Sequence, residues 1–159
     1  MLKKNLKSAT SALIGASLLV TLAGCANGPD APTRMVKQVT DGVEATSGSV
    51  KAVNVLLVAQ PDGSAVLVGT FVNEGAAPDG ITAITVKGIA PTGFMPELLT
   101  QNKPVIFTGD SANASAVFPA AGAVAGDRLP LEITFQNAGP MKLDAIVRAQ
   151  DGYYASTTK

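Results

Sequence analysis

The fold is decided by residues 49–73, which read SVKAVNVLLVAQPDGSAVLVGTFVN. A β-branched, apolar run from Ser49 to Ala59 ends at Gln60-Pro61-Asp62-Gly63, and a second apolar run follows immediately from Ser64 to Asn73. Proline presets the bend of a turn and glycine accepts a positive φ, so Pro-Asp-Gly indicates a turn for a physical reason. Two apolar runs joined by such a turn predict a β-hairpin.

Further short strands are predicted on the C-terminal side of this hairpin. A second Pro-Asp-Gly at 78–80 precedes an apolar run. Residues 129–135 and 141–148 alternate apolar with polar side chains, the period of a half-buried strand, with Ile146 as the one exception on the polar side. No helical period is evident, so we predict an all-β chain, an antiparallel β-sandwich over residues 41–155. Tyr153 and Tyr154 are expected to close the last strand, and Ser156 to Lys159 to fray. The other predicted strands are 81–90, 103–108 and 115–118.

The N-terminus has the pattern of an export signal. Lys3, Lys4 and Lys7 precede an uncharged apolar run over residues 9–22, which is shorter than the roughly 20 residues of a membrane-spanning helix. A basic start, a short apolar middle and a small-residue end are typical of a signal peptide, here residues 1–24, rather than of an uncleaved membrane anchor. Residues 25–40 follow as a predicted flexible tether, rich in Gly, Pro and Asn near its start.

Leu22-Ala23-Gly24-Cys25 resembles the lipobox of bacterial lipoproteins. The resemblance implies cleavage before Cys25 and a diacylglyceryl lipid on its thiol, with further acylation such as palmitate. Cys25 is the only cysteine, so the chain cannot form an intramolecular disulfide. The expected location is therefore the extracytoplasmic face of the bacterial cell membrane, where two or more acyl chains give stable attachment.

Composition excludes several classes of partner. Without residues 1–24 the chain keeps 9 basic and 12 acidic side chains, a formal net charge of −3. It has no basic block, so we expect no nucleic acid binding. Tryptophan is absent and aromatics make up 4% of the chain, which argues against a carbohydrate platform built on stacked rings.

Two stretches resemble the periplasmic copper chaperones of the PCuAC, or PCu(A)C, type. They are Val68-Gly-Thr-Phe-Val-Asn-Glu-Gly-Ala-Ala-Pro-Asp79 and Gly126-Asp-Arg-Leu-Pro-Leu-Glu-Ile-Thr-Phe-Gln-Asn-Ala-Gly139. The start of the domain, from Asp41 to Val58, is closer to the actinobacterial LpqE-like lipoproteins of the same superfamily. The resemblance covers about Asp41 to Gln150 and implies a cupredoxin-like, immunoglobulin-like β-sandwich.

Copper chaperones of this type bind copper through His and Met, since Cu(I) prefers imidazole and thioether ligands. The chain contains no His. Among its methionines, Met35 lies in the predicted tether and Met141 begins an apolar strand face, so Met95 is the one candidate thioether ligand. From these residues alone we expect no bound copper, no other metal and no cofactor beyond the lipid.

Enzymatic chemistry finds no support in the residues. Without His or a free Cys, a Ser-His or Cys-His nucleophile is impossible, and so is a zinc site of His and Cys. Asn113-Ala114-Ser115 fits a glycosylation pattern that we attribute to chance, and residues 122–126 lack the Lys of a phosphate loop. The remaining candidates are carboxylates that each adjoin a glycine, which indicates turns rather than an acid/base pair or a calcium site: Asp79, Asp110, Asp127 and Asp151.

The sequence thus predicts a non-enzymatic, lipid-anchored envelope protein whose domain binds a protein partner or assists assembly. Because loops on a rigid scaffold commonly carry function, residues 88–109 are the expected contact region. The alternative is a copper-handling protein of the PCuAC type with a reduced, Met-based site.

Overall fold

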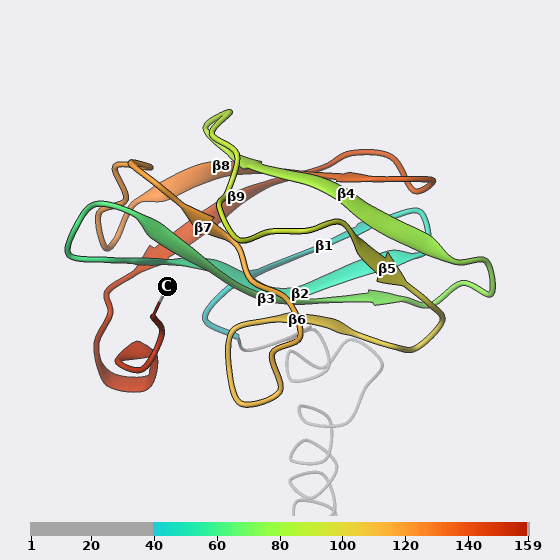
Figure 1. Ribbon diagram of the computed structural model, residues 1–159, viewed down its shortest axis with the longest axis horizontal. Helices are drawn as coiled ribbons and strands as arrows, with labels where there is room; N and C mark the ends of the chain where they lie inside the picture. The colour runs from blue at the N-terminus through green and yellow to red at the C-terminus, as the bar shows by residue number, and fades with distance from the viewer. Residues whose placement is uncertain (1–39, 159) are drawn as a thin grey trace, which may run out of the picture. The chain divides into compact units, whose positions relative to one another are not determined.

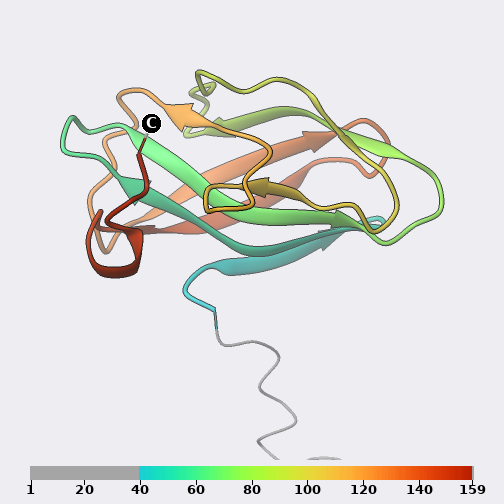
Figure 2. The ribbon, with the colours of Figure 1, turned by 60° about the horizontal axis from the view of Figure 1, so that its bottom comes forward.

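The computed structural model describes residues 40–158 and forms a strongly curved all-β sandwich (Figures 1 and 2). The signal peptide, Cys25, Met35 and most of the tether lie outside the described residues. No helix within residues 40–158 is long and apolar enough to cross a membrane. The strands are β1 Val43–Ser47, β2 Val50–Ala59, β3 Ala65–Asn73, β4 Asp79–Val86, β5 Glu97–Leu99, β6 Val105–Phe107, β7 Val117–Phe118, β8 Arg128–Phe135 and β9 Met141–Arg148.

The predicted hairpin is confirmed as β2 and β3. Its turn is closed by hydrogen bonds from Gly63 N to Gln60 O at 3.0 Å and from Gln60 N to Ser64 O at 2.9 Å. The alternating strands β8 and β9 are also confirmed, with Ile133 facing Met141 and Leu129 facing Ala145 in the ladder. These are the segments whose turn chemistry and period were clearest in the sequence.

Other strands differ from their predicted bounds. The strand predicted over 81–90 already begins at Asp79 and ends at Val86, because Lys87 adopts φ +52° and Ile89 N donates back to Val86 O at 2.8 Å. The pieces predicted over 103–108 and 115–118 shrink to β6 and β7. Strand β5 lies between the strands predicted over 81–90 and 103–108, where the sequence predicted no strand.

The sheet runs in the order β5-β4-β8-β9-β2-β3-β6, with β1 paired to β2 and β7 to β3. All these pairs are antiparallel except β2 with β9, where Leu56 to Val58 run parallel to Ile146 to Arg148. The prediction of a purely antiparallel sandwich was therefore wrong for the pairing of β2 with β9. The predicted all-β sandwich class is confirmed.

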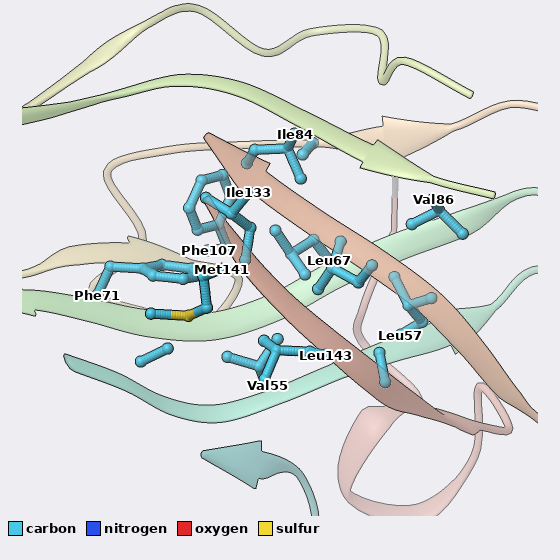
Figure 3. Packing of buried hydrophobic residues seen from close by; sticks show 14 of the residues in the cluster. Val55, Leu57, Leu67, Phe71, Ile84, Val86, Phe107, Ile133, Met141 and Leu143 are labelled. Carbon is cyan, nitrogen blue, oxygen red and sulfur yellow. The ribbon is translucent and has the colours of Figure 1, made fainter. Parts of the chain in front are cut away.

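The core fills the inside of the curved sheet (Figure 3). Phe71 and Phe107 meet edge to face, with ring centroids 5.7 Å apart, and Phe135 lies 6.4 Å from Phe71. Phe71 and Phe107 are fully buried, and Met141 is 3% exposed beside them. Met141 is thus core filler, as its strand position predicted.

The C-terminus does not end as expected. β9 stops at Arg148, and Tyr153 and Tyr154 belong instead to a 3-10 turn, Gly152–Tyr154, that folds back toward β2 and β3 (Figures 1 and 2). Tyr154 packs on Leu56 and Val58, which point away from the main core. We call residues 151–157 the C-terminal strap.

Hydrogen bonds tie this strap down at its far end. Thr157 is buried, and its carbonyl accepts from Gln60 Nε2 at 3.2 Å and from Gln150 Nε2 at 2.8 Å. The predicted fraying was wrong at Thr157, because releasing a buried carbonyl from two amide donors costs free energy.

Candidate functional site

The loop that carries Met95 is held at three points. Thr92 pairs with β7, donating its N–H to Val117 O at 2.7 Å and accepting from Val117 N at 3.1 Å. Phe94 packs against the core and stacks on Phe107, with centroids 6.3 Å apart and planes 28° apart. Glu97 then begins β5. The backbone on both sides of Met95 is therefore fixed.

Because Phe94 points inward, its neighbour Met95 points outward and is 73% exposed. An exposed methionine fixed by its neighbours presents its sulfur to solvent, where a soft metal can reach it. The structure does not bring a second thioether to it, since Met141 is buried in the core. Met35 lies outside the described residues.

Carboxylates do not complete a metal site either. Within residues 40–158, no group of three or more His, Cys, Asp or Glu side chains could hold a metal ion. In this part of the chain Met95 therefore offers a single soft ligand. Any copper bound there needs further ligands from outside residues 40–158.

The region predicted as a contact surface, residues 88–109, carries two large exposed apolar side chains. Leu98 on β5 is 66% exposed and lies three positions from Met95. β5 pairs only with β4 among the strands, at the end of the sheet order. The exposed pair thus lies at a sheet edge.

In the stretch from Val68 to Asp79, which resembles copper chaperones, Asn73 has a structural role. This side chain is fully buried, and its Oδ1 accepts from Ser49 Oγ at 2.8 Å and from Gly75 N at 2.9 Å. Its Nδ2 donates to the carbonyls of Ala77 at 2.7 Å and Leu99 at 3.2 Å. Asn73 uses both ends of its amide to hold the loop after β3 against β5.

Gly75 in the same stretch must be small. A Cβ there would lie 2.8 Å from both Cβ and Oγ of Ser49. The Asn-x-Gly pattern is therefore explained by loop packing.

Asp79 links the two resembling stretches. Its carboxylate is 3% exposed and accepts from the N–H groups of Gly80, Asn137 and Ala138 at 2.7, 2.8 and 2.8 Å. Burial raises the pKa of Asp79, but these backbone donors outweigh burial and lower it below 3.8. Asp79 fixes the β8–β9 turn from across the sheet, a structural role.

The other aspartates singled out in the sequence lie in loops at the surface. Asp110 follows β6, Asp127 donates its N–H to Val124 O at 3.1 Å in a turn, and Asp151 precedes the 3-10 turn. No acid/base pair is formed by these three. Sequence reasoning missed a different feature, the surface at the C-terminal strap, because that surface depends on a fold-back that the pattern did not show.

Comparisons with known proteins agree with the fold. No family model and no curated protein matches the sequence. Among solved structures, the apo PCuAC domain from PmoF1 is 23% identical, with a TM-score of 0.58 over 67% of this chain and 99% of that domain. The copper-bound PCuAC domain from PmoF2 is 20% identical, with a TM-score of 0.53 over 67% and 98%. The apo PmoF2 PCuAC domain is 17% identical, with a TM-score of 0.55 over 69% and 98%. This chain therefore has the cupredoxin-like β-sandwich fold of the PCuAC domains.

Proposed function

We propose that this chain is a non-enzymatic, copper-handling protein of the cell envelope that binds Cu(I) transiently through Met95. The observation that carries the proposal is the 73% exposed thioether of Met95, held outward by the partly buried Phe94 that packs on the core, on a scaffold with the fold of PCuAC domains. One of these similar domains is described as copper-bound. Thioether sulfur is a ligand that Cu(I) prefers.

Because the chain contains no His, it can offer copper no imidazole ligand, and this limits how it can bind the metal. A single thioether cannot surround the metal, so the other ligands come from the molecule that delivers or accepts it. Such a shared site releases copper easily, which suits transfer better than storage.

A Cu(I) competition titration against a chromophoric chelator tests this proposal. Met95→Leu keeps the apolar shape and removes the sulfur, so binding should weaken at least about tenfold, a loss of about 1.4 kcal/mol. Met141→Leu is the matched control, because its sulfur is buried and its loss should leave copper affinity unchanged.

Met35→Leu completes the series. Equal copper affinity in the wild type and in Met95→Leu would contradict the proposal, and so would the absence of any binding. A loss only in Met35→Leu would move the ligand to the tether and also contradict it.

A second candidate function is the capture of an envelope protein partner, favoured by Leu98 beside Met95 at the sheet edge. Exposed apolar side chains that gather at one place mark interaction sites. Leu98→Ser should abolish partner capture in a pull-down but leave Cu(I) affinity unchanged. Retained capture by this variant would exclude Leu98 from the contact.

We further propose that Cys25 carries a diacylglyceryl lipid that anchors the protein on the extracytoplasmic face of the membrane. The support is the Leu22-Ala23-Gly24-Cys25 sequence after a short apolar run. Detergent phase partitioning should place the wild type in the detergent phase and Cys25→Ser in the aqueous phase. Mass spectrometry of the mature N-terminus should find the lipid on Cys25, and an unmodified thiol there would overturn the assignment.

A further inference from the structure

A groove of about 490 Å³ lies between the strap and the strands β3 and β6, and Met95 is not among its lining residues. Its lining comes from segments far apart in the sequence: β2, β3, the bend after β6, and the strap. The strap turns back toward these strands in both ribbon views (Figures 1 and 2). The groove is thus a product of the whole fold, formed where the strap meets the sheet.

Irregular backbone shapes this groove at β2. The ladder with β3 shifts register between Val53 and Leu56, and Asn54 in that bulge has φ +54°. The neighbouring Gly69 leaves room for the bulge, since a Cβ there would lie 3.1 Å from Val55 Cγ2. Bulges commonly re-aim a side chain beside functional sites.

Thr108 provides a second irregularity, at the end of β6. Its φ is +71°, a left-handed conformation that is strained for a β-branched residue. The Thr108 hydroxyl donates to Leu67 O at 2.9 Å and holds the residue there. This bend places Gly109 and Asp110 in the groove lining. A strained backbone of this kind persists only where the surrounding fold holds it, and such residues cluster at ligand-binding positions.

Tyr153 forms the opposite wall and is 87% exposed. Its ring meets Tyr154 edge to face, with centroids 5.2 Å apart and planes 89° apart. Tyr154 is itself buried and donates its hydroxyl to Asp41 Oδ2 at 3.2 Å. The exposed ring of Tyr153 therefore packs against a fixed neighbour. The Tyr153 side chain then loses less conformational entropy when a ligand binds to it.

The chemistry of the lining selects the ligand. Hydroxyls, an amide and one carboxylate line the groove beside the tyrosine, and no Lys or Arg does, which disfavours anionic ligands. Asp110 makes no hydrogen bond or ion pair with the rest of residues 40–158, so its carboxylate is available to accept from ligand hydroxyls. The polar residues that line the groove include Asn54, Thr70, Thr108, Asp110 and Ser156.

We propose that this groove binds a neutral saccharide, with one sugar ring against Tyr153 and its hydroxyls directed to Asp110 and the threonines. A sugar has an apolar C–H face and a polar rim, which match an aromatic ring surrounded by hydroxyl and carboxylate acceptors. The lack of Trp excludes a platform of several stacked rings but not a site built on one tyrosine. The assignment is independent of copper.

Saturation-transfer NMR with the full-length protein in detergent tests the proposal. The probes are chitotriose and maltotriose, both neutral, with choline as a cationic probe and methyl phosphate, whose methyl protons report binding, as an anionic one. We expect a neutral sugar to bind with a Kd of about 1 mM or tighter. Tyr153→Ala should weaken this binding about tenfold and Asp110→Asn several-fold.

Val124→Ala is the matched control, since Val124 is 60% exposed and does not line this groove. Its affinity for the sugar should equal that of the wild type. Asp110→Asn lies on a surface bend without side-chain contacts, so it reports on the site even if Tyr153→Ala disturbs the strap. Three results would overturn the proposal: transfer to choline or methyl phosphate instead of both sugars, no transfer to any probe, or unchanged sugar affinity in both groove variants.

Discussion

Two buried polar residues, Asn73 and Asp79, hold loops of the sandwich in place through hydrogen bonds to the backbone. Asn73 is fully buried and Asp79 is 3% exposed, and each satisfies backbone groups of loops that have no regular partner. Buried polar groups persist where they are fully hydrogen-bonded. Asn73 and Asp79 therefore stabilise the scaffold, and the side chains of the exposed loops are not needed for that role.

The carboxylate of Asp79 should make folding stability depend on acid pH. Burial alone raises its pKa, but the N–H donors of Gly80, Asn137 and Ala138 lower it below 3.8 in the folded protein. Protonation therefore favours the unfolded chain. The stabilisation is present above about pH 4, the ordinary Asp range, and is lost as the pH falls through the lower folded-state pKa.

Asp79→Asn should lower the free energy of unfolding at pH 7 by about 3 kcal/mol, because one amide group then faces three N–H donors. Between pH 4 and pH 2 the free energy of unfolding of the variant should fall less than that of the wild type. Urea denaturation at both pH values measures this. Asp144→Asn, at an exposed position of β9, is the control and should behave as the wild type. Parallel pH profiles for Asp79→Asn and the wild type would refute the role given to the carboxylate.

At the scale of the element, the segments with local signals were predictable. The β2–β3 hairpin has Pro61-Asp62-Gly63 at its turn, and β8 and β9 alternate apart from Ile146, so the bounds of these strands are nearly those expected. β5 was missed because three residues between prolines carry no period. The parallel join of β2 to β9 was missed because pairing between distant strands leaves no mark within either strand.

The candidate sites divide in the same way. Met95 could be predicted as the one available thioether because ligand preference is a property of the residue, and Met141 as core because of its strand period. The groove at the strap could not be predicted. It depends on the left-handed Thr108 and on Tyr154 packing against Leu56 on the outer face of β2, both of which arise from tertiary contacts.

The strap should contribute to stability in a way that alkaline pH removes. Burial, reinforced by the nearby carboxylate of Asp41, raises the pKa of Tyr154 to about 12 from an ordinary value of 10.0. Ionisation therefore favours the unfolded chain. The contribution is fully present below pH 10 and is lost as the pH rises toward 12.

Tyr154→Phe keeps the ring over Leu56 and removes the ionisable hydroxyl. The wild type should lose up to about 2 kcal/mol more stability than this variant between pH 9 and pH 12. Tyr153→Phe is the control, because the ring of Tyr153 is 87% exposed. The chain has two tyrosines, so this variant retains only Tyr154. Its tyrosinate absorbance should titrate near pH 12, and a midpoint near pH 10 would disprove the burial argument.

At the scale of the whole described domain, the curved sheet and the strap are two layers of unequal strength. The main core spans all the strands from β2 to β9, whereas the outer cluster contains only Leu56, Val58 and Tyr154 with Val68 packed against it. Asp41 ties the two layers, since it accepts from Tyr154 Oη at 3.2 Å and from Arg148 Nη2 at 3.3 Å. Small, polar-linked layers open locally at a lower free energy than a shared core.

Native-state hydrogen exchange should resolve these two layers. The strap amides of Tyr154 and Thr157, bonded to Asp151 O at 2.8 Å and Tyr154 O at 3.0 Å, should exchange through a local opening, while Leu57 exchanges only on global unfolding. Asp41→Ala removes both bonds to its carboxylate and should speed strap exchange about tenfold, a loss of about 1.4 kcal/mol, without changing Leu57. Asp144→Ala, at an exposed position of β9, is the matched control and should alter neither rate. Equal acceleration of the strap and Leu57 would instead mean that strap and core unfold as one unit, because a single cooperative domain transmits the loss to every amide.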